Sequence, residues 1–338
     1  MKKRVLLIAV LSLCVLLCAC GQAPEPVNDA PEKLGISSGN FLNDGFLAQN
    51  EGDSFYYYCK YAKEGDRSQN GIYQVNSETG ESTRLTEHTG SYLNLYDGYL
   101  YYLVRRGDSD WRSIVWRVKC DGSSPPEQYY ATLYEITGGM MMANDMLFVV
   151  NTEGLCAAPL KDTGLLTDSD MTVIEKGSGN PVVLSDTLYY LHRKDRDNSY
   201  RSKPLDDLTA AHEEVASIEY MHKVMAGYGY VYYVDSTNNQ DYYRASLSDG
   251  KVEKILTLQG SIVIPFNLYK GHLYYMESGY IWRCDLDGSN LKKVEEKPWR
   301  EGLAEEEKQS FSWRLYIAND TVYVFNEDLS RPVYQVKI

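Results

Sequence analysis

Residues 271–294 read GHLYYMESGYIWRCDLDGSNLKKV, and this stretch decides the fold. Two runs rich in aromatic and aliphatic residues are separated by residues 277–279, and an Asp-Gly pair at 287–288 follows the second run. Asp-Gly between such runs is a strong hairpin signal, because both residues tolerate a positive φ. The stretch therefore predicts consecutive antiparallel strands joined by tight turns.

The same pattern occurs seven times along the chain. Each copy has a turn-forming pair, one variable residue, an aliphatic or aromatic residue, and then Tyr or Phe. Consecutive copies lie 41 to 49 residues apart, and an aromatic residue followed by Arg or Gln usually comes next. Four short strands every 40 to 50 residues, roughly, is the dimension of a β-propeller blade. The copies are anchored at Phe55, Leu100, Leu147, Leu188, Val231, Leu273 and Val322.

We predict an all-β propeller of seven four-stranded blades, or of six if the first or last copy is degenerate. The last copy has three strand-like runs and then stops at Ile338. We expect residues around 32–42 to supply its missing strand, close the ring and cover an exposed edge. Residues 297–310 predict the one helical interruption. A sandwich would not repeat seven times, and helical repeats would show a period of about 3.6 residues.

The first residues have the pattern of an export signal. Lys2, Lys3 and Arg4 precede an apolar run that is too short to be a comfortable membrane span. The sequence LCAC at 17–20 resembles the bacterial lipobox, in which a cysteine is lipidated and becomes the new N-terminus. We therefore expect residues 1–19 to be a lipoprotein signal peptide and Cys20 to be lipidated. The alternative is a secreted protein cleaved at an ordinary site.

The remaining chain divides into a tether and a body. Residues 20–37 contain three prolines and few apolar residues, which is typical of an extended tether. Residues 38–338 hold the propeller. This arrangement predicts a protein anchored by lipid to the extracytoplasmic face of the cell membrane.

Composition and charge narrow the classes of partner. Hydrophobic residues make up 43% of the chain, and 30 tyrosines far outnumber 7 phenylalanines, which suits strands with one wet edge. The formal net charge of −13 argues against binding to nucleic acid and against electrostatic adhesion to anionic lipid. We expect no nucleic-acid partner and a monomer.

No motif indicates a cofactor, a metal or a catalytic group. Cys59, Cys120, Cys156 and Cys284 lie one to a repeat without Cys-x-x-Cys spacing, so buried single thiols are expected, although their disulfide state is left open. The five histidines are dispersed, and the Asp-x-Asp-Gly at 285–288 lacks the later ligands of a calcium loop. We predict no cofactor and no metal.

Two stretches resemble known propeller families. Residues 274–290, YYMESGYIWRCDLDGSN, are similar to the YWTD-type repeat of low-density-lipoprotein-receptor propellers. Residues 38–59, SGNFLNDGFLAQNEGDSFYYYC, resemble the opening of a propeller family of unknown function that is common in lipoproteins and surface proteins of clostridia and their relatives. The resemblance covers about residues 38–338 and implies the blade, without implying a ligand.

An arginine recurs at one position of the repeat. It could form a ring of cations around a groove, or it could pack its stem on a neighbouring aromatic residue and pair with a carboxylate between blades, and the second interpretation is favoured. The residues are Arg117, Arg201, Arg244 and Arg283.

Loop lengths indicate a candidate binding face. The connection between the second and third strands is minimal in the third and sixth copies and predicted to be long in the first, second, fourth and fifth. In propellers these loops share a face with the inter-blade connections around the channel. Exposed Trp and Tyr beside Arg would suit contact with a protein or glycan, although ordinary solvated loops are the alternative. The candidates are Arg105, Arg106, Asp110, Trp111, His192, Arg193, Asp195, Tyr200, Asn238 and Tyr242.

Three hypotheses of function follow. The first is a non-enzymatic binding or scaffold module for a cell-envelope protein or polysaccharide. The second is a glycan-active hydrolase or lyase with its site at the channel mouth, which would need two carboxylates, or a histidine and an acid, in hydrogen-bond reach. The third is a structural member of an envelope assembly with an apolar patch on its outer rim.

Overall fold

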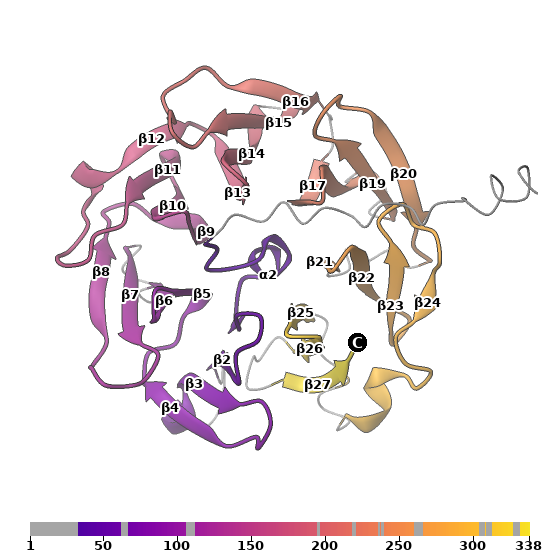
Figure 1. Cartoon of the computed structure of the whole chain (residues 1–338), viewed down its shortest axis with the longest axis horizontal. Helices are drawn as coiled ribbons and strands as arrows, with labels where there is room; N and C mark the ends of the chain where they lie inside the picture. The colour runs from indigo at the N-terminus through magenta and orange to yellow at the C-terminus, as the bar shows by residue number, and fades with distance from the viewer. Residues whose placement is uncertain are drawn as a thin grey trace, which may run out of the picture.

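The computed structural model describes residues 33–61, 67–105, 112–194, 197–217, 221–235, 237, 240–259, 266–303, 308, 313–326 and 332–338. Seven antiparallel sheets stand around a central axis, and the chain visits them in order (Figure 1). The predicted all-β propeller with seven blades is confirmed. In each blade the strands follow one another from the axis outward.

Three blades come from the N-terminal half. The first contains β1 (Leu47–Ala48), β2 (Phe55–Lys60), β3 (Gly71–Asn76) and β4 (Ser82–Thr86). The second contains β5 (Ser91–Tyr96), β6 (Tyr99–Arg105), β7 (Ser113–Lys119) and β8 (Glu127–Ala131). The third contains β9 (Ile136–Ala143), β10 (Met146–Asn151), β11 (Gly154–Pro159) and β12 (Thr172–Glu175).

Four blades complete the ring. The fourth contains β13 (Ser178–Leu184), β14 (Thr187–Lys194), β15 (Asp197–Pro204) and β16 (Glu213–Ser217). The fifth contains β17 (Met221–Gly227), β18 (Tyr230–Asp235), β19 (Asp241–Ser246) and β20 (Val252–Thr257). The sixth contains β21 (Phe266–Tyr269), β22 (His272–Glu277), β23 (Tyr280–Asp285) and β24 (Lys292–Lys293). The seventh has three strands in the described chain, β25 (Arg314–Ala318), β26 (Thr321–Phe325) and β27 (Pro332–Lys337).

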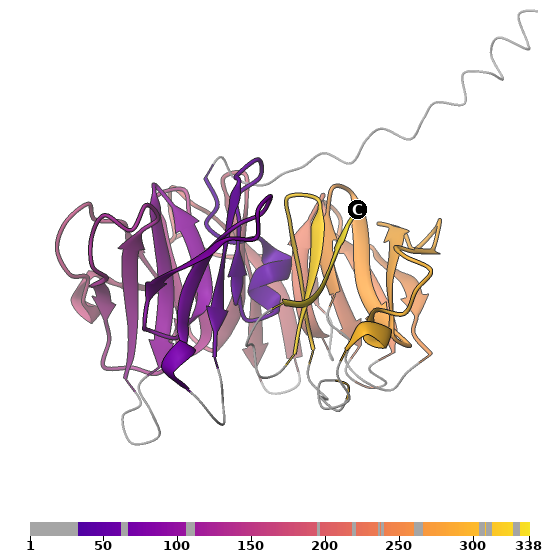
Figure 2. The ribbon, with the colours of Figure 1, turned by 90° about the horizontal axis from the view of Figure 1, so that it is seen from below.

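The tight turns between the first and second strands of the blades distinguish the two faces of the ring. Asp97 and Gly98 have φ values of 46° and 75°, and Asn319 and Asp320 have 48° and 56°, as a two-residue hairpin turn with two left-handed residues requires. These turns lie together on one face, the turn face, which is the upper side in Figure 2. The second-to-third connections and the inter-blade connections lie on the opposite face, the loop face.

The N-terminal segment does not close the ring as predicted. Residues 33–42 add no strand to β27, and instead run to the axis, where α2 (Ser38–Leu42) lies among the inner strands (Figure 1). Side chains close the ring instead, because β1 packs through Leu47 against Tyr316 and Phe325 of the seventh blade. Residues 33–37, predicted to be tether, are part of the fold.

The core is rich in tyrosine. Six of the seven repeat anchors are fully buried, whereas Phe55 is 40% exposed. Two tyrosines of the inner strands use their hydroxyls to contact the next blade. Tyr96 accepts a hydrogen bond from the Asp145 amide at 2.6 Å, and Tyr269 accepts one from the Asp320 amide at 3.0 Å. The abundance of tyrosine thus reflects contacts between blades as well as wet edges.

Helical structure is minor. The predicted interruption at 297–310 contains the 3₁₀ helix η3 (Trp299–Gly302), which packs Trp299 edge-on against Trp313 with ring centroids 4.6 Å apart. The other described 3₁₀ helices are η1 (Arg67–Gln69) and η2 (Asp168–Asp170). In the described residues no helix is both long and apolar enough to span a bilayer.

Candidate functional site

Residues 33–36 enter the propeller at the turn face. The Gly35 amide donates to the Met142 carbonyl at 2.9 Å, and the Leu95 amide donates to the Gly35 carbonyl at 3.0 Å. Lys33 pairs with Asp145 at 3.1 Å, next to the turn between β9 and β10. The segment therefore lies between the inner strands of the second and third blades and bonds to both.

The helix α2 continues along the axis. Asn40 donates to the Ile317 carbonyl at 3.2 Å and accepts from the Ile317 amide at 3.1 Å. Ser38 Oγ donates to the Ala226 carbonyl at 2.9 Å. A Cβ on Gly39 would lie 1.9 Å from Asn267 Oδ1, so only glycine allows this approach. The helix is thus fixed to the fifth and seventh blades and packs closely against the sixth.

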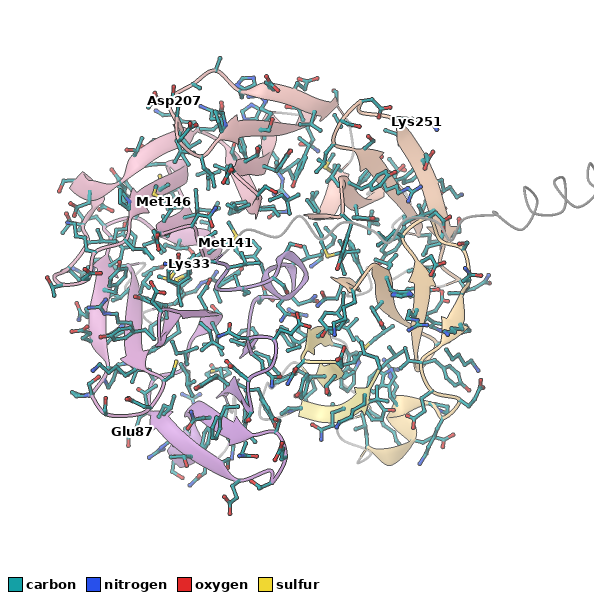
Figure 3. The ribbon with its side chains drawn as sticks, viewed as in Figure 1. Lys33, Glu87, Met141, Met146, Asp207 and Lys251 are labelled. Atoms are coloured by element: carbon teal, nitrogen blue, oxygen red, sulfur yellow. The ribbon has the colours of Figure 1, made fainter. Side chains whose placement is uncertain are left out.

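A cavity of about 440 Å³ lies on the axis above α2, on the turn face. Its floor includes Ser37 and Ser38, and its rim includes Tyr228, Lys270 and Asn319. Met141, at the inner end of the third blade, also lines it, whereas Asp207 and Lys251 lie far out on the rim of the ring (Figure 3). Further wall residues are the aliphatic Val182, Leu184, Leu268 and Ile317. We name this cavity the axial funnel.

A charged cluster lies at the other end of the axis, towards the loop face. Asp44 follows α2, accepts from Arg314 Nε at 2.9 Å, and accepts from the Tyr92 hydroxyl at 3.4 Å. Lys223 is close enough for its charge to interact with Asp44 and Arg314. We name Asp44, Tyr92, Lys223 and Arg314 the lower-mouth cluster.

Backbone geometry directs two members of this cluster. Tyr92 and Lys223 have φ values of 52° and 50°, and each lies in an irregularity of the inner strand where the pairing register shifts. A left-handed conformation at such bulky residues is uncommon and is concentrated at functional sites. Gly139 and Asn180 are also left-handed near the start of their inner strands, so the feature is repeated around the mouth.

Burial controls the protonation of the cluster. It lowers the pKa of Lys223, an effect that Asp44 opposes and Arg314 reinforces. Burial likewise raises the pKa of the Tyr92 hydroxyl, so this group stays neutral at ordinary pH. A lysine with a lowered pKa beside a carboxylate can hold or accept a proton.

Three predicted site residues lie in strands near the loop face. Arg105 ends β6 and is exposed, and His192 and Arg193 lie near the end of β14. The connection predicted to be long in the fourth blade is short, since Lys194 pairs with Asp197. Five candidates lie outside the described residues: Arg106, Asp110, Trp111, Asp195 and Asn238. Cys20 also lies outside them.

Two predicted contact residues are buried, so the expectation that they are exposed is wrong. Tyr200 in β15 is 0% exposed and Tyr242 in β19 is 1% exposed. Both strands extend into the stretches that were predicted to be loops, and the alternating pattern turns both rings inward. Tyr200 stacks on Tyr189 with centroids 6.1 Å apart, and Tyr242 meets Phe266 edge-on at 4.9 Å.

A second polar cluster lies in the seam between the third and fourth blades. Glu175 lies 3.9 Å from His192 Nδ1, 3.5 Å from His212 Nδ1 and 3.4 Å from Arg201 Nη1. Ser178 Oγ lies 3.1 Å from the same nitrogen of His192. A nucleophile relay needs the hydroxyl and the carboxylate on different ring nitrogens, so this arrangement is not a catalytic triad. The sequence missed Glu175 and His212 because they come from separate strands with no local motif.

Arg117 and Arg244 pack on aromatic rings as the favoured interpretation predicts, but their carboxylate partners lie in the same blade, so the expected pairing between blades is wrong for both. Arg117 lies over the Tyr99 ring at 4.7 Å and pairs with Glu127 at 2.6 Å. Arg244 lies over Tyr230 at 4.3 Å and pairs with Glu253 at 2.8 Å. Arg201 instead pairs with Glu175 of the preceding blade. These side chains fasten strands and blades.

Cys59, Cys120, Cys156 and Cys284 are free thiols, and all except Cys120 are buried. Burial raises the pKa of Cys59 to about 12, so its thiol is unreactive at neutral pH. Within the described ranges no three histidine, cysteine or acidic side chains are grouped to hold a metal ion.

No family model matches this chain, and no curated protein matches it either. Solved structures do. The chain is similar to a puromycin-hydrolyzing peptidase of Mycobacterium tuberculosis (13% identity, TM-score 0.55, 89% of this chain and 52% of that one). It is also similar to a puromycin hydrolase (11%, 0.58, 90% and 53%) and to the N-terminal domain of Nup159 (11%, 0.55, 90% and 96%). The chain spans about half the length of the two hydrolases, and at these identities the likeness shows the propeller fold alone.

Proposed function

We propose that this chain is a lipid-anchored extracytoplasmic propeller that binds a cell-envelope protein or glycan without converting it. The observation that carries the proposal is the path of the N-terminal segment. Lys33 lies at the turn face, beside Asp97 and Asp145, so a chain running back to a lipid on Cys20 leaves from that face. The loop face is on the opposite side of the ring.

The exit face and short length of the tether favour one orientation at the membrane. Twelve residues separate Cys20 from Lys33, and the thirteen Cα–Cα steps span at most about 45 Å when fully extended. An anchored propeller would therefore turn its turn face to the membrane and present its loop face outward. Partners that approach from outside meet the ends of β6 and β14 and the lower-mouth cluster first.

Charge at the loop face indicates the kind of partner. The charges of Arg105 and Arg314 interact with Tyr92, and that of Lys223 interacts with Asp44, at the mouth. Arg193 is exposed near the end of β14 on the same face. This local excess of cations stands out in a chain of net charge −13. It favours a partner that carries anionic groups, such as an acidic polysaccharide or an acidic segment of protein.

The test uses photo-cross-linking in intact cells that express the full chain. A photoreactive residue replaces Arg193 on the loop face or, as the matched control, Asp97 on the turn face. We expect a cross-linked envelope component from position 193, lost when Arg105 is changed to Glu, and none from position 97. Cross-links from position 97 alone would contradict the proposed orientation. Cys20→Ala should move the chain from the membrane to the soluble fraction, and retention at the membrane would refute the anchor.

A second candidate function, a glycan-active lyase or hydrolase, is favoured by one observation. The lower-mouth cluster joins a lysine of lowered pKa to a carboxylate, a neutral phenol and an arginine. A lyase acting on uronic acids needs a base and a cation that neutralises the substrate carboxylate. Incubation of the protein with a panel of polyuronates, with Lys223→Met as the matched control, separates the two candidates. If the parent protein forms unsaturated products and Lys223→Met does not, the function is catalysis and not binding alone.

A further inference from the structure

In six of the seven blades, one backbone position of the inner strand directs its hydrogen-bonding groups to the axis. In a two-residue hairpin the residues that flank the turn bond to each other, so the preceding residue turns its N–H and C=O away from the partner strand. Because the inner strand is the edge of its sheet, these groups point into the channel. In the second to seventh blades the residues are Leu95, Met142, Val183, Ala226, Leu268 and Ile317.

The N-terminal segment and Asn94 satisfy half of these groups, with at least one in each of the second, third, fifth and seventh blades. Gly35 bonds to the Leu95 amide and the Met142 carbonyl, and the Met142 amide donates to Asn94 Oδ1 at 2.9 Å. Asn40 bonds to both groups of Ile317. The match confirms that these backbone groups point to the axis, and it shows that an extended chain fits against them.

The fourth and sixth blades differ. In the described chain no backbone or side-chain group bonds to the axial N–H and C=O of Val183 and Leu268, and both residues line the axial funnel. Both side chains are buried, with 1% and 9% of their surface exposed. Backbone groups in such surroundings are satisfied in native proteins by a strand, a side chain or water. The funnel therefore carries two open strand edges.

We propose that the axial funnel binds a short extended peptide with aliphatic side chains, which adds its backbone to the edges of β13 and β21. Residues 33–36 already do this at the edges of β5 and β9. Main-chain hydrogen bonds to an exposed edge, with pockets for side chains, are an established mode of peptide recognition. The volume of 440 Å³ falls within the roughly 300–1,000 Å³ of ligand pockets.

The walls decide between a peptide and other occupants. Val182, Leu184, Leu268 and Ile317 offer aliphatic surface beside polar side chains such as Ser37, Gln49 and Asn50. This mixture suits a peptide, with its polar backbone and aliphatic side chains, better than a sugar with hydroxyls on every side. The tether is a poor occupant, because three prolines in residues 24–31 lack the N–H that strand addition requires. The funnel opens at the face from which the tether leaves, so its peptide would come from the membrane side.

Gly227 allows the funnel to be filled without disturbing the fold. A Cβ at Gly227 would meet only Leu268 Cδ1, at 3.5 Å, which is ordinary contact, and the backbone there is not left-handed. Gly227→Leu therefore places an aliphatic side chain in the funnel. Gly302→Leu is the matched control, because a Cβ on Gly302 meets nothing within 4 Å and the residue lies in η3, away from the axis.

The experiment titrates the chain from residue 20, with Cys20→Ala, with a library of acetylated aliphatic tetrapeptide amides. We expect binding by the parent protein and by Gly302→Leu, and loss of binding in Gly227→Leu with an unchanged melting temperature. Amide hydrogen exchange at Val183 and Leu268 should slow when peptide is present. The proposal is overturned if no peptide binds, if Gly227→Leu binds equally well, if oligosaccharides bind in place of peptides, or if binding appears only after residues 21–32 are deleted.

Discussion

Asn40 and Ile317 are joined by two reciprocal hydrogen bonds, of 3.2 Å and 3.1 Å, although they lie at opposite ends of the chain. The first residue belongs to α2 on the axis, and the second belongs to the inner strand of the last blade. The side-chain amide of Asn40 thus satisfies the backbone groups of Ile317, as a neighbouring strand would. Because the first and seventh blades share no strand in the described chain, this pair is a principal tie between the two ends.

Replacement of Asn40 by Ala should destabilise the fold. The change leaves the N–H and C=O of Ile317 buried without partners, which costs about 2–4 kcal/mol. Urea unfolding measures the loss as a lower midpoint. Asn50→Ala is the control, since Asn50 is exposed and its change should stay within about 0.5 kcal/mol. Equal midpoints for the two variants would show that Asn40 is not a structural tie.

Two deletions should differ sharply. Removal of residues 21–32 takes away only predicted tether, whereas removal of 21–37 also takes away the hydrogen bonds that Lys33 and Gly35 make with the second and third blades. Three such backbone bonds contribute about 3 kcal/mol in total. We expect the longer deletion alone to lower the thermal midpoint in calorimetry. If both deletions leave the midpoint unchanged, residues 33–37 merely rest on the surface.

Lys223 should make the free energy of unfolding increase with pH at alkaline pH. Burial lowers its pKa in the folded state, so between that value and the ordinary value the unfolded chain binds more protons. Stability therefore rises with pH through this window, and the unfavourable charge is fully present below it. Lys223→Met should unfold at higher urea concentration than the parent at pH 7, and the difference should shrink as the pH enters the window. The exposed Lys292→Met should show no such trend. A Lys223→Met protein that is less stable at pH 7 would mean that its ammonium is well compensated.

Glu175 should fasten the third blade to the fourth. Glu175→Gln removes the charge that faces Arg201, His192 and His212, and a hydrogen bond to a charged group contributes about 1.5–3 kcal/mol. We expect a lower urea midpoint and faster amide exchange in β12 and β13. Glu213→Gln, at an exposed glutamate in β16 of the fourth blade, is the matched control. Unchanged exchange in both strands would show that the seam does not depend on the carboxylate.

The sequence was sufficient for the blades because their signals are local. Turn pairs such as Asp97-Gly98 and the buried aliphatic anchors recur at a fixed period, and each is readable within ten residues. The N-terminal segment was misplaced because its partners, Met142 and Ile317, are distant in sequence, and strand-like composition does not tell which edge a segment joins.

The candidate site was less predictable. The polar neighbours of Tyr200 and Tyr242 resemble loop sequence, so composition alone does not show where β15 and β19 begin. The lower-mouth cluster brings together Asp44, Tyr92, Lys223 and Arg314 from four parts of the chain. Tyr92 and Lys223 are distinguished only by their left-handed backbone in an irregular part of the inner strand, and no residue pattern predicts that conformation.

The segment that would connect this protein to its lipid is also the hub of the ring. A pull on residue 33 acts first on the bonds of Gly35 and then on those of Ser38 and Asn40, each of which holds a different blade. Mechanical load from a partner at the loop face and from an anchor at the turn face would therefore meet on the axis. Under such a load, the bonds between the N-terminal segment and the inner strands would break before the outer strands separate.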